Sequence, residues 1–571
     1  MKKYIILYFL ALSCSNNYHE KTELPLLGFE KTDGKETATY KEAIEFFELL
    51  AKENESISIS KKGLTDVQLP LHLVKYSSPN STKNPLKIFI NNGIHPGESD
   101  GIDASMLLFR EIATGNYSIP DHVEIYCIPV YNIGGALNRN KHSRVNQNGP
   151  ESYGFRGNAK NFDLNRDFIK TDTKNMLSFA EIYHEVNPDI LIDTHVSNGA
   201  DYQYTLTHLY TQANKLGGKL GDFWVDKLQP AIETNLKSKG YEMTPYVNVF
   251  NRPPNEGFNQ FLDTPRYSTG YTSLWNTLGV MIETHMLKPY PERVEATLAK
   301  LKGIIEEGAV FSSDIKNLRT KNFDYYLNSK TYPISFKLDS SKFNLLNFKG
   351  YEYGYKKSKV TGQDRLFYDT LKPIEIEIPY YSFYSVAKEV TIPKAYYIPS
   401  AYTEIINLLN VNAIAYQKIE KDEERLIETY TIEDFSTYTT PYEGHYPHYN
   451  TEVSIKKENS VLPKGGYLVP TNQRGIRYII ETLEPEAVDS FFNWNFFDAI
   501  LQQKEGFSPY VFEELAYEVL EENQELKKAF LQKKEAEQDF NENAYQQLNW
   551  IFKNSKYYEE SHRRYPILRV F

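Results

Sequence analysis

The chain contains few cysteines and carries a net negative charge. Its 571 residues include two cysteines, Cys14 and Cys127. Cys127 lies in the apolar run 125–130, where a buried structural thiol is expected rather than a nucleophile. The net charge of -11 and the pI near 5.7 argue against a nucleic-acid-binding protein, which would need a basic surface. We therefore expect no nucleic-acid partner and no disulfide within the mature protein.

Beyond the N-terminus, the chain has no apolar run of membrane-spanning length. The stretch Tyr4 to Leu12 follows two lysines and is too short to cross a bilayer, but it suits the core of a signal peptide. Ser13-Cys14 then resembles a bacterial lipoprotein processing site, although Ala11 stands where leucine is most common. We expect export to the bacterial cell envelope, with lipidation of Cys14 favoured over free secretion and no other contact with the membrane.

Helix and strand patterns alternate through the first half of the chain. Amphipathic helix patterns cover 40–52, 101–113, 174–186 and 292–307. Strand-like runs cover 56–60, 67–76, 86–90, 190–192 and 280–282. The last two are continuously apolar, which is typical of strands buried on both faces, and 86–90 also has a buried pattern. These patterns predict an α/β domain at about 25–315, with a mixed, mostly parallel sheet and helices on both faces.

The second half of the chain has a different pattern. Many short Tyr-, Phe- and Ile-rich runs occupy 320–395 and predict a β-rich module. A mixed stretch follows, and 472–554 is largely helical, with Glu514 to Gln532 the clearest helix. In the aromatic segment 489–505, core packing is favoured over a ligand platform. The predicted organisation is a signal segment (1–14), a tether (15–24), the α/β domain (25–315), the β-rich module (316–395) and a mixed, then mainly helical region (396–571).

Polar clusters follow three of the predicted strands. They are His95-Pro96-Gly97-Glu98, Asp193-Thr194-His195 and Glu283-Thr284-His285. In an open α/β sheet, residues just past the carboxyl ends of the strands meet in one crevice. Two imidazoles and one carboxylate form the ligand set of a catalytic zinc, which leaves one position for water. We therefore expect His95, Glu98 and His195 to hold a metal, with the Glu283 carboxylate beside it.

Several side chains near these clusters have more than one candidate role. Asp193 either orients a ligating imidazole or serves only the strand. His285 falls on the same side as Glu283 and is a further candidate ligand, but ligation by His95, Glu98 and His195 is favoured. The glycine-rich segment 132–167 carries several arginines, whose rigid fork matches a substrate carboxylate. For Arg139 and Arg156, a surface or loop-bracing role is favoured.

The order of these motifs, His-x-x-Glu, Arg, Asp-x-Asn-Arg, His and Glu, resembles the zinc carboxypeptidases of the carboxypeptidase A-like family over residues 25–315. The resemblance implies one Zn²⁺ ion bound by His95, Glu98 and His195. It also implies Glu283 as general base and acid. Arg144 would polarise the scissile carbonyl. Arg139 is the alternative residue for this role, because residues 132–135 depart from the family pattern. Asn165 and Arg166 would hold the substrate's terminal carboxylate, and either Tyr267 or Tyr271 would cover the substrate.

This resemblance predicts a zinc metallocarboxypeptidase that hydrolyses the C-terminal peptide bond of peptides. Its partner would be a peptide with a free C-terminal carboxylate. An amide hydrolase acting on acyl-amino acids or on peptidoglycan stem peptides is an alternative, because zinc deacylases resembling aspartoacylase or succinylglutamate desuccinylase share the metal motif and the Asp-x-Asn-Arg segment. A non-catalytic surface binding protein is a further alternative, against which the intact Glu283 speaks.

Overall fold

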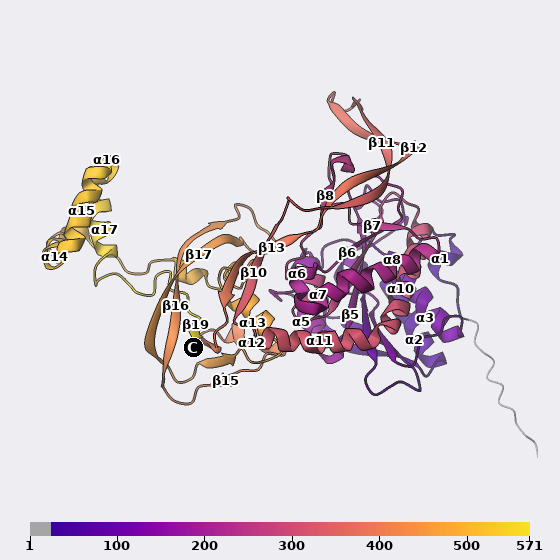
Figure 1. Cartoon of the computed structure of the whole chain (residues 1–571), viewed down its shortest axis with the longest axis horizontal. Helices are drawn as coiled ribbons and strands as arrows, with labels where there is room; N and C mark the ends of the chain where they lie inside the picture. Colours follow the sequence, from indigo (N-terminus) through magenta and orange to yellow (C-terminus); the bar gives the residue numbers. More distant parts are fainter. Residues whose placement is uncertain (1–23) are drawn as a thin grey trace, which may run out of the picture.

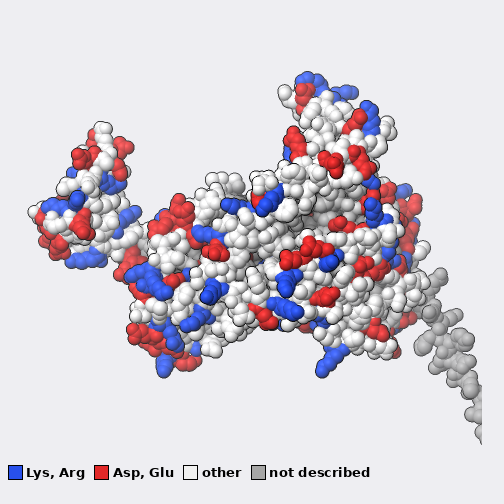
Figure 2. Space-filling model, in the orientation of Figure 1, with Lys and Arg blue, Asp and Glu red and all other residues white. Residues whose placement is uncertain are grey.

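The computed structural model describes residues 24–571 (Figure 1). The predicted signal segment and Cys14 lie outside the described residues. Within 24–571, no helix combines the length and the apolar composition needed to cross a membrane. On the face shown in Figure 2, basic and acidic side chains are interspersed along the body of the molecule.

An eight-stranded sheet forms the frame of the first half of the chain, in the order β1-β2-β4-β3-β5-β9-β6-β7. The strands are β1 (Ile57–Leu64), β2 (Pro70–Ser77), β3 (Leu86–Asn91), β4 (Val123–Ile128), β5 (Ile190–Ser197), β6 (Leu206–Tyr210), β7 (Met243–Pro245) and β9 (Leu278–His285). The central strands β4, β3, β5 and β9 run parallel to one another. β2 pairs antiparallel with β1 and β4, and β6 pairs antiparallel with β9. The predicted mixed, mostly parallel sheet is confirmed.

Helices cover both faces of this sheet, as predicted. One face packs against α2 (Tyr40–Glu53), α3 (Asp100–Thr114), α8 (Gln229–Ser238) and α10 (Tyr290–Val310). The other face packs against α5 (Lys174–Val186) and α9 (Ser268–Ser273). Successive residues of a strand point to opposite faces, so Ile88 and Ile90 enter the first core while Phe89 enters the second. Burial on both faces explains the continuous apolar runs 190–192 in β5 and 280–282 in β9.

Further elements connect or extend this frame. They are α1 (Gly28–Lys31), α4 (Ile133–Leu137), η1 (Leu164–Arg166), α6 (Ala213–Leu216), α7 (Gly218–Phe223), η2 (Trp224–Leu228), η3 (Pro254–Glu256), β8 (Phe258–Asn259) and α11 (Ser312–Leu327). Cys127 in β4 is buried, as expected, and burial raises the pKa of its thiol to about 12. This thiol is therefore a poor nucleophile.

Strands dominate the chain from Thr331 to Pro470. β10 (Thr331–Leu338) pairs with β13 (Tyr384–Thr391), while β11 (Asn344–Lys357) and β12 (Asp364–Tyr381) form a long hairpin. This hairpin projects from the body of the molecule, and β8 pairs with its base (Figure 1). A six-stranded sheet follows, made of β14 (Ala395–Ile398), β15 (Gln417–Lys418), β16 (Glu423–Thr437), β17 (His448–Leu462), β18 (Tyr467–Pro470) and β19 (Leu568–Val570).

The six-stranded sheet is tied to the first half of the chain by apolar contacts. Its helices α12 (Thr403–Val411) and α13 (Ile476–Leu483) join the same core as α5. The aromatic segment 489–505, which includes η4 (Asp498–Leu501), contributes buried side chains to that core: Phe491, Phe492, Trp494 and Phe497. The predicted core role of this segment is confirmed.

A small helical bundle stands apart at the far end of the molecule from the eight-stranded sheet (Figure 1). It contains α14 (Pro509–Glu522), α15 (Gln524–Ala536), α16 (Gln538–Asn541) and α17 (Ala544–Lys553), and it has its own apolar core. The prediction of one continuous helix from Glu514 to Gln532 is wrong, because the helix is interrupted at Asn523. That residue is extended (φ -126°, ψ 93°), and its side chain accepts a hydrogen bond from Leu526 N to cap α15. The capping preference of asparagine overrides the helical periodicity.

Candidate active site

The carboxyl ends of three adjacent parallel strands bring the predicted site residues together. β3 leads into the turn that carries His95 and Glu98, β5 carries His195, and β9 carries Glu283. In the β5–β9 register, His195 lies directly opposite Glu283. Neighbouring parallel strands place such pairs on the same face of the sheet, so side chains separated by almost two hundred positions converge in one crevice.

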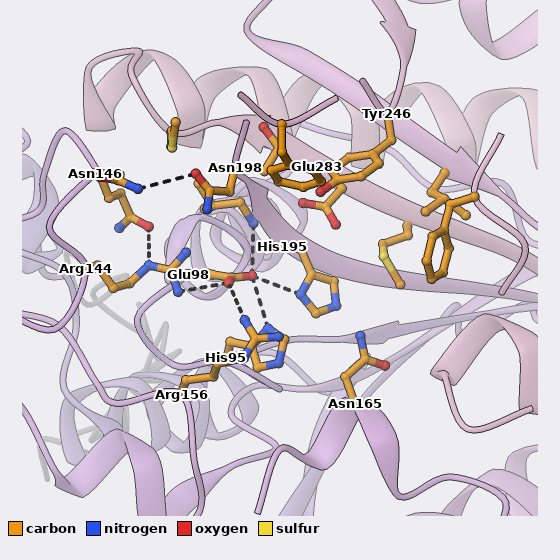
Figure 3. A pocket seen from close by; sticks show the side chains of 18 of the residues that line it. His95, Glu98, Arg144, Asn146, Arg156, Asn165, His195, Asn198, Tyr246 and Glu283 are labelled. Atoms are coloured by element: carbon orange, nitrogen blue, oxygen red, sulfur yellow. Dashed lines mark hydrogen bonds and ion pairs between the residues drawn. The ribbon is translucent and has the colours of Figure 1, made fainter. Parts of the chain in front are cut away.

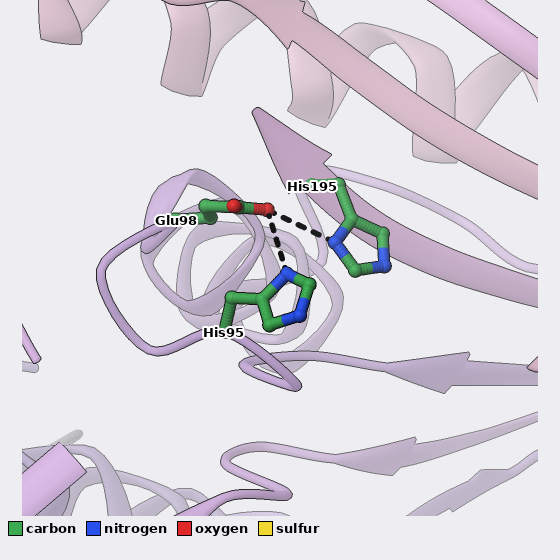
Figure 4. Close-up of side chains that lie close together, drawn as sticks. All are labelled: His95, Glu98 and His195. Carbon is green, nitrogen blue, oxygen red and sulfur yellow. Dashed lines mark hydrogen bonds and ion pairs between the residues drawn. The ribbon is translucent and has the colours of Figure 1, made fainter. Parts of the chain in front are cut away.

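His95, Glu98 and His195 form a compact, buried group (Figure 4). One potential ligand atom from each residue lies within 4.8 Å of the other two. Glu98 Oε2 is 2.9 Å from His195 Nδ1 and 3.4 Å from His95 Nδ1. The two imidazole centroids are 5.0 Å apart. Among residues 24–571, this is the group of histidine, cysteine and acidic side chains with the geometry to hold a metal ion.

The hydrogen bonding of the two imidazoles fits a divalent ion. His95 Nδ1 is buried and has no hydrogen-bond partner within the described residues. His95 Nε2 is hydrogen-bonded to Asp163 Oδ1 at 2.8 Å, whereas His195 Nε2 lies 3.1 Å from Asp193 Oδ2 at ion-pair distance without a hydrogen bond. A carboxylate behind a histidine fixes the tautomer that leaves the inner nitrogen free to bind a metal. Sequence reasoning weighed Asp193 for this role and missed Asp163, which stands two residues before Asn165.

His285 does not join this group. Its Nε2 is 2.8 Å from Asp201 Oδ1, and its ring stacks on Tyr202 with centroids 4.0 Å apart. His285 is therefore not a candidate ligand, in agreement with the preference for His95, Glu98 and His195 alone. Alternation along β9 put His285 on the side of Glu283, but this histidine is the last residue of the strand.

Electrostatics keep the Glu98 carboxyl ionised. Burial acts to raise its pKa, but Arg144 and the two imidazoles outweigh that effect and hold the pKa well below the ordinary value. Arg144 Nη1 lies 2.9 Å from Glu98 Oε1, on the side away from the imidazoles. An ionised carboxylate between two imidazoles is the form that binds a cation.

Glu283 lies beside this group and has a different environment. Burial raises the pKa of its carboxyl to about 8, with the Glu98 charge adding to the rise and His195 opposing it. In Figure 3, Glu283 is seen next to Tyr246 across the crevice from Glu98. Two neighbouring carboxyls with pKa values displaced in opposite directions are a common arrangement at hydrolytic sites.

Arg139 and Arg156, both in segment 132–167, differ in what they contact. Arg139 donates to the carbonyls of Thr37, Ala38 and Ser152, which is the loop-bracing role that was favoured. Arg139 does not line the crevice, so it is not an alternative to Arg144 for polarising the scissile carbonyl. Arg156 was assigned the same bracing role, and that assignment is wrong. Its guanidinium lies 2.9 Å from Asp163 Oδ2 and 3.6 Å from Glu98 Oε1, within the crevice.

Asn165 and Arg166 form the opposite wall of the crevice, on the short helix η1. Asn165 Oδ1 accepts a hydrogen bond from Ser268 N at 3.2 Å. The Arg166 guanidinium stacks over the Tyr267 ring at 4.6 Å from its centroid and donates to Asn165 O. Stacking on an aromatic ring fixes the plane of a guanidinium and preserves its fork for a carboxylate.

Tyr267 lines the crevice, whereas Tyr271 does not. The Tyr271 side chain is fully buried in an aromatic core, and its hydroxyl donates to Asn412 at 2.5 Å. The structure adds Tyr246, which sequence reasoning missed. Tyr246 follows the three-residue strand β7 in a segment without a periodic pattern, so nothing in the sequence marked it.

These side chains line a single open cavity of about 410 Å³ (Figure 3). Its metal-binding end carries His95, Glu98 and His195, and its arginine-rich wall carries Arg144, Arg156 and Arg166. Apolar side chains, among them Leu209, Phe261 and Met281, also line the cavity. The cavity therefore combines a cation site, a carboxyl group and several guanidinium groups within reach of one small ligand.

Comparison with known proteins agrees with this geometry. The sequence model of the zinc carboxypeptidase family matches residues 44–199. The chain is 21% identical to Carboxypeptidase 2 of Trichophyton rubrum over 484 residues, which cover 81% of this chain and 84% of the fungal protein. Carboxypeptidase 2 of Trichophyton equinum is also 21% identical, over 490 residues and the same shares of each chain. A metallo-carboxypeptidase structure from Burkholderia cenocepacia has 16% identity and a TM-score of 0.37, covering 48% of this chain and 70% of its own. Residues 44–199 thus belong to a domain of the zinc carboxypeptidase family.

Proposed function

We propose that the protein is a zinc metallocarboxypeptidase that hydrolyses the C-terminal peptide bond of peptides. The observation that carries this proposal is the sharing of one cavity by two kinds of group. The histidine and glutamate group suits a metal, and Arg166 with Asn165 suits a terminal carboxylate. The names of the fungal relatives support the same activity.

His95, Glu98 and His195 would hold the ion. When bound, Zn²⁺ supplies Lewis acidity toward a carbonyl and lowers the pKa of a water molecule toward neutrality. The buried Glu283 carboxylate would accept a proton from the attacking water and return it to the leaving amine. Burial raises the pKa of this carboxyl to about 8, within reach of neutral pH for a group that both takes and gives a proton.

The arginines divide the work of binding in this proposal. Arg144, held beside Glu98, would donate to the carbonyl oxygen as negative charge develops there. Arg166 and Asn165 would bind the terminal carboxylate of the peptide, which sets the scissile bond one residue from the chain end. Tyr246 and Tyr267 both line the cavity and are the candidates to close over the substrate.

We also propose export of the protein with a lipid on Cys14. The support is the pair of lysines before the apolar stretch Tyr4 to Leu12 and the Ser13-Cys14 sequence that follows. Mass spectrometry of the N-terminal peptide, after expression in a bacterium that processes lipoproteins, would detect a diacylglyceryl group on Cys14. An unmodified Cys14 in the mature protein would contradict this proposal.

The activity is tested by measuring zinc content and hydrolysis for the wild type and for Glu283→Gln. The substrates are blocked dipeptides, the same dipeptides with an amidated C-terminus, acyl-amino acids and muropeptides. We expect one zinc per chain in both proteins, cleavage of the free-acid dipeptides by the wild type, and no turnover by Glu283→Gln. Preferred cleavage of acyl-amino acids or muropeptides would show that these compounds, and not peptides, are the substrates. Full activity of Glu283→Gln would show that Glu283 does not transfer the proton.

A further inference from the structure

The turn between β16 and β17 reaches the active site from the second half of the chain. Tyr442 and His445 pair across this turn. The two residues between them, Glu443 and Gly444, have φ angles of 50° and 81°. Positive φ at both central positions is the pattern of a type I′ hairpin turn, in which Asn-Gly is the preferred sequence. A glutamate at the first central position is therefore a residue that the turn itself does not favour.

The Glu443 side chain leaves the turn and contacts the loop that precedes η1. Its Oε2 accepts a hydrogen bond from Asp163 N at 2.7 Å. The next two residues contact the chain on either side of η1. A Cβ atom on Gly444 would lie 2.8 Å from the Phe162 ring, and His445 Nε2 lies 2.7 Å from Asp172 Oδ2. Three consecutive residues of the turn thus contact the segment 162–172, which contains η1.

That segment serves both ends of the cavity. The Asp163 side chain faces His95 Nε2 at 2.8 Å and accepts from Asn165 N at 2.9 Å, so it links a candidate metal ligand to the start of η1. Tyr442, the first residue of the turn, lies against the Arg166 guanidinium and forms a cation–π contact with Arg266, 5.7 Å from the ring centroid. A shift of the Asp163 backbone would therefore move the groups that face the substrate carboxylate.

We propose that Glu443 is a positioning residue, which holds Asp163 and η1 so that Asn165 and Arg166 meet the terminal carboxylate of the substrate. The proposal rests on the proposed carboxypeptidase function. It gives the second half of the chain a specific part in the active site, because the β16–β17 turn supplies a contact that the α/β domain does not supply for itself. Glu443 touches neither the substrate nor the ion in this account.

The chain offers a matched set of variants at this position. Glu443→Asn suits the type I′ turn better than glutamate does, but its side chain is one methylene shorter and withdraws the acceptor from Asp163 N. Glu443→Gln keeps the length and one acceptor oxygen and removes only the charge. Both variants are compared with the wild type as full-length proteins. The measurements are steady-state kinetics on a blocked dipeptide that the wild type cleaves, and zinc content.

We expect Glu443→Asn to raise KM by about fivefold to tenfold with kcat changed by less than about twofold, as for one lost hydrogen bond. Glu443→Gln should restore a KM near that of the wild type. Zinc content and thermal unfolding should be unchanged, because Asn fits the turn. An unchanged KM in Glu443→Asn, or a loss confined to kcat, would overturn the inference. If the wild type itself cleaves no C-terminal peptide bond, the proposed function fails instead, and this result is visible before any variant is measured.

Discussion

Replacing Asp163 with asparagine is expected to weaken zinc binding without removing any candidate ligand. Asp163 Oδ1 lies 2.8 Å from His95 Nε2, and its carboxyl has a strongly lowered pKa because His95, Arg156 and Arg166 together outweigh the effect of burial. An ionised carboxylate behind an imidazole raises the basicity of the inner nitrogen and fixes its tautomer. The amide of Asp163→Asn is the same size and still accepts one hydrogen bond, but it carries no charge.

Substitutions of such carboxylates lower metal affinity by about 10-fold to 100-fold. We expect the lower end of this range, about tenfold or about 1.4 kcal/mol, because the amide oxygen still accepts from His95. The assay is competition for zinc with a chromogenic chelator at fixed pH. Asp201→Asn is the matched control: Asp201 Oδ1 also lies 2.8 Å from a histidine Nε2, its side chain is 12% exposed like that of Asp163, and its partner His285 is outside the metal group. Equal zinc affinity for wild type and Asp163→Asn, or an equal loss in Asp201→Asn, would refute this reasoning.

Three further predictions concern stability and the turn between the first two candidate ligands. Burial raises the pKa of Asp103 to about 6, so the stability that its protonated form contributes is complete below about pH 4 and is lost as the pH rises through about 6. The unfolding free energy of the wild type minus that of Asp103→Asn should therefore fall by about 3 kcal/mol as the pH rises from about 4 to above about 6. A value of this difference that does not depend on pH would contradict the prediction. Arg293 is fully buried, with Nε 3.0 Å from Asp100 Oδ2, so Arg293→Met should destabilise the fold by about 3–5 kcal/mol in denaturant titrations, and a loss below about 1 kcal/mol would be inconsistent with an uncompensated buried charge. In Gly97→Ala the added Cβ would lie 2.5 Å from Arg144 Cδ and 2.8 Å from Gly154 O, so kcat/KM should drop at least about tenfold with the metal retained, whereas wild-type kinetics would show that Arg144 does not need its present position.

The strands and the metal group could be predicted from the sequence because one physical cause produces both signals. A parallel strand buried on both faces is continuously apolar, and the first polar residues after it lie in the crevice at the edge of the sheet. His95, His195 and Glu283 follow that rule, so their convergence was predictable although they are far apart in the chain. Asn165 and Arg166 were found through the resemblance to a family rather than through periodicity.

The residues that were missed or misassigned lie where contacts, not patterns, decide position. Arg139 and Arg156 belong to the same irregular segment, yet one braces the backbone and the other enters the cavity. Tyr246 has no strand or helix to place it. Glu443 acts from a hairpin turn almost three hundred residues after Asp163, and no local property of the sequence connects the two. Long-range contacts of this kind follow from the tertiary fold alone.

The central claim is that His95, Glu98 and His195 together hold one zinc ion beside Glu283. The most direct measurement is anomalous X-ray diffraction at the zinc edge from crystals of the zinc-loaded protein. The account predicts a single strong peak within about 2.0–2.2 Å of His95 Nδ1, His195 Nδ1 and a Glu98 oxygen, with Glu283 outside bonding distance. A peak elsewhere, or no peak among these three side chains in protein loaded with one zinc per chain, would contradict it.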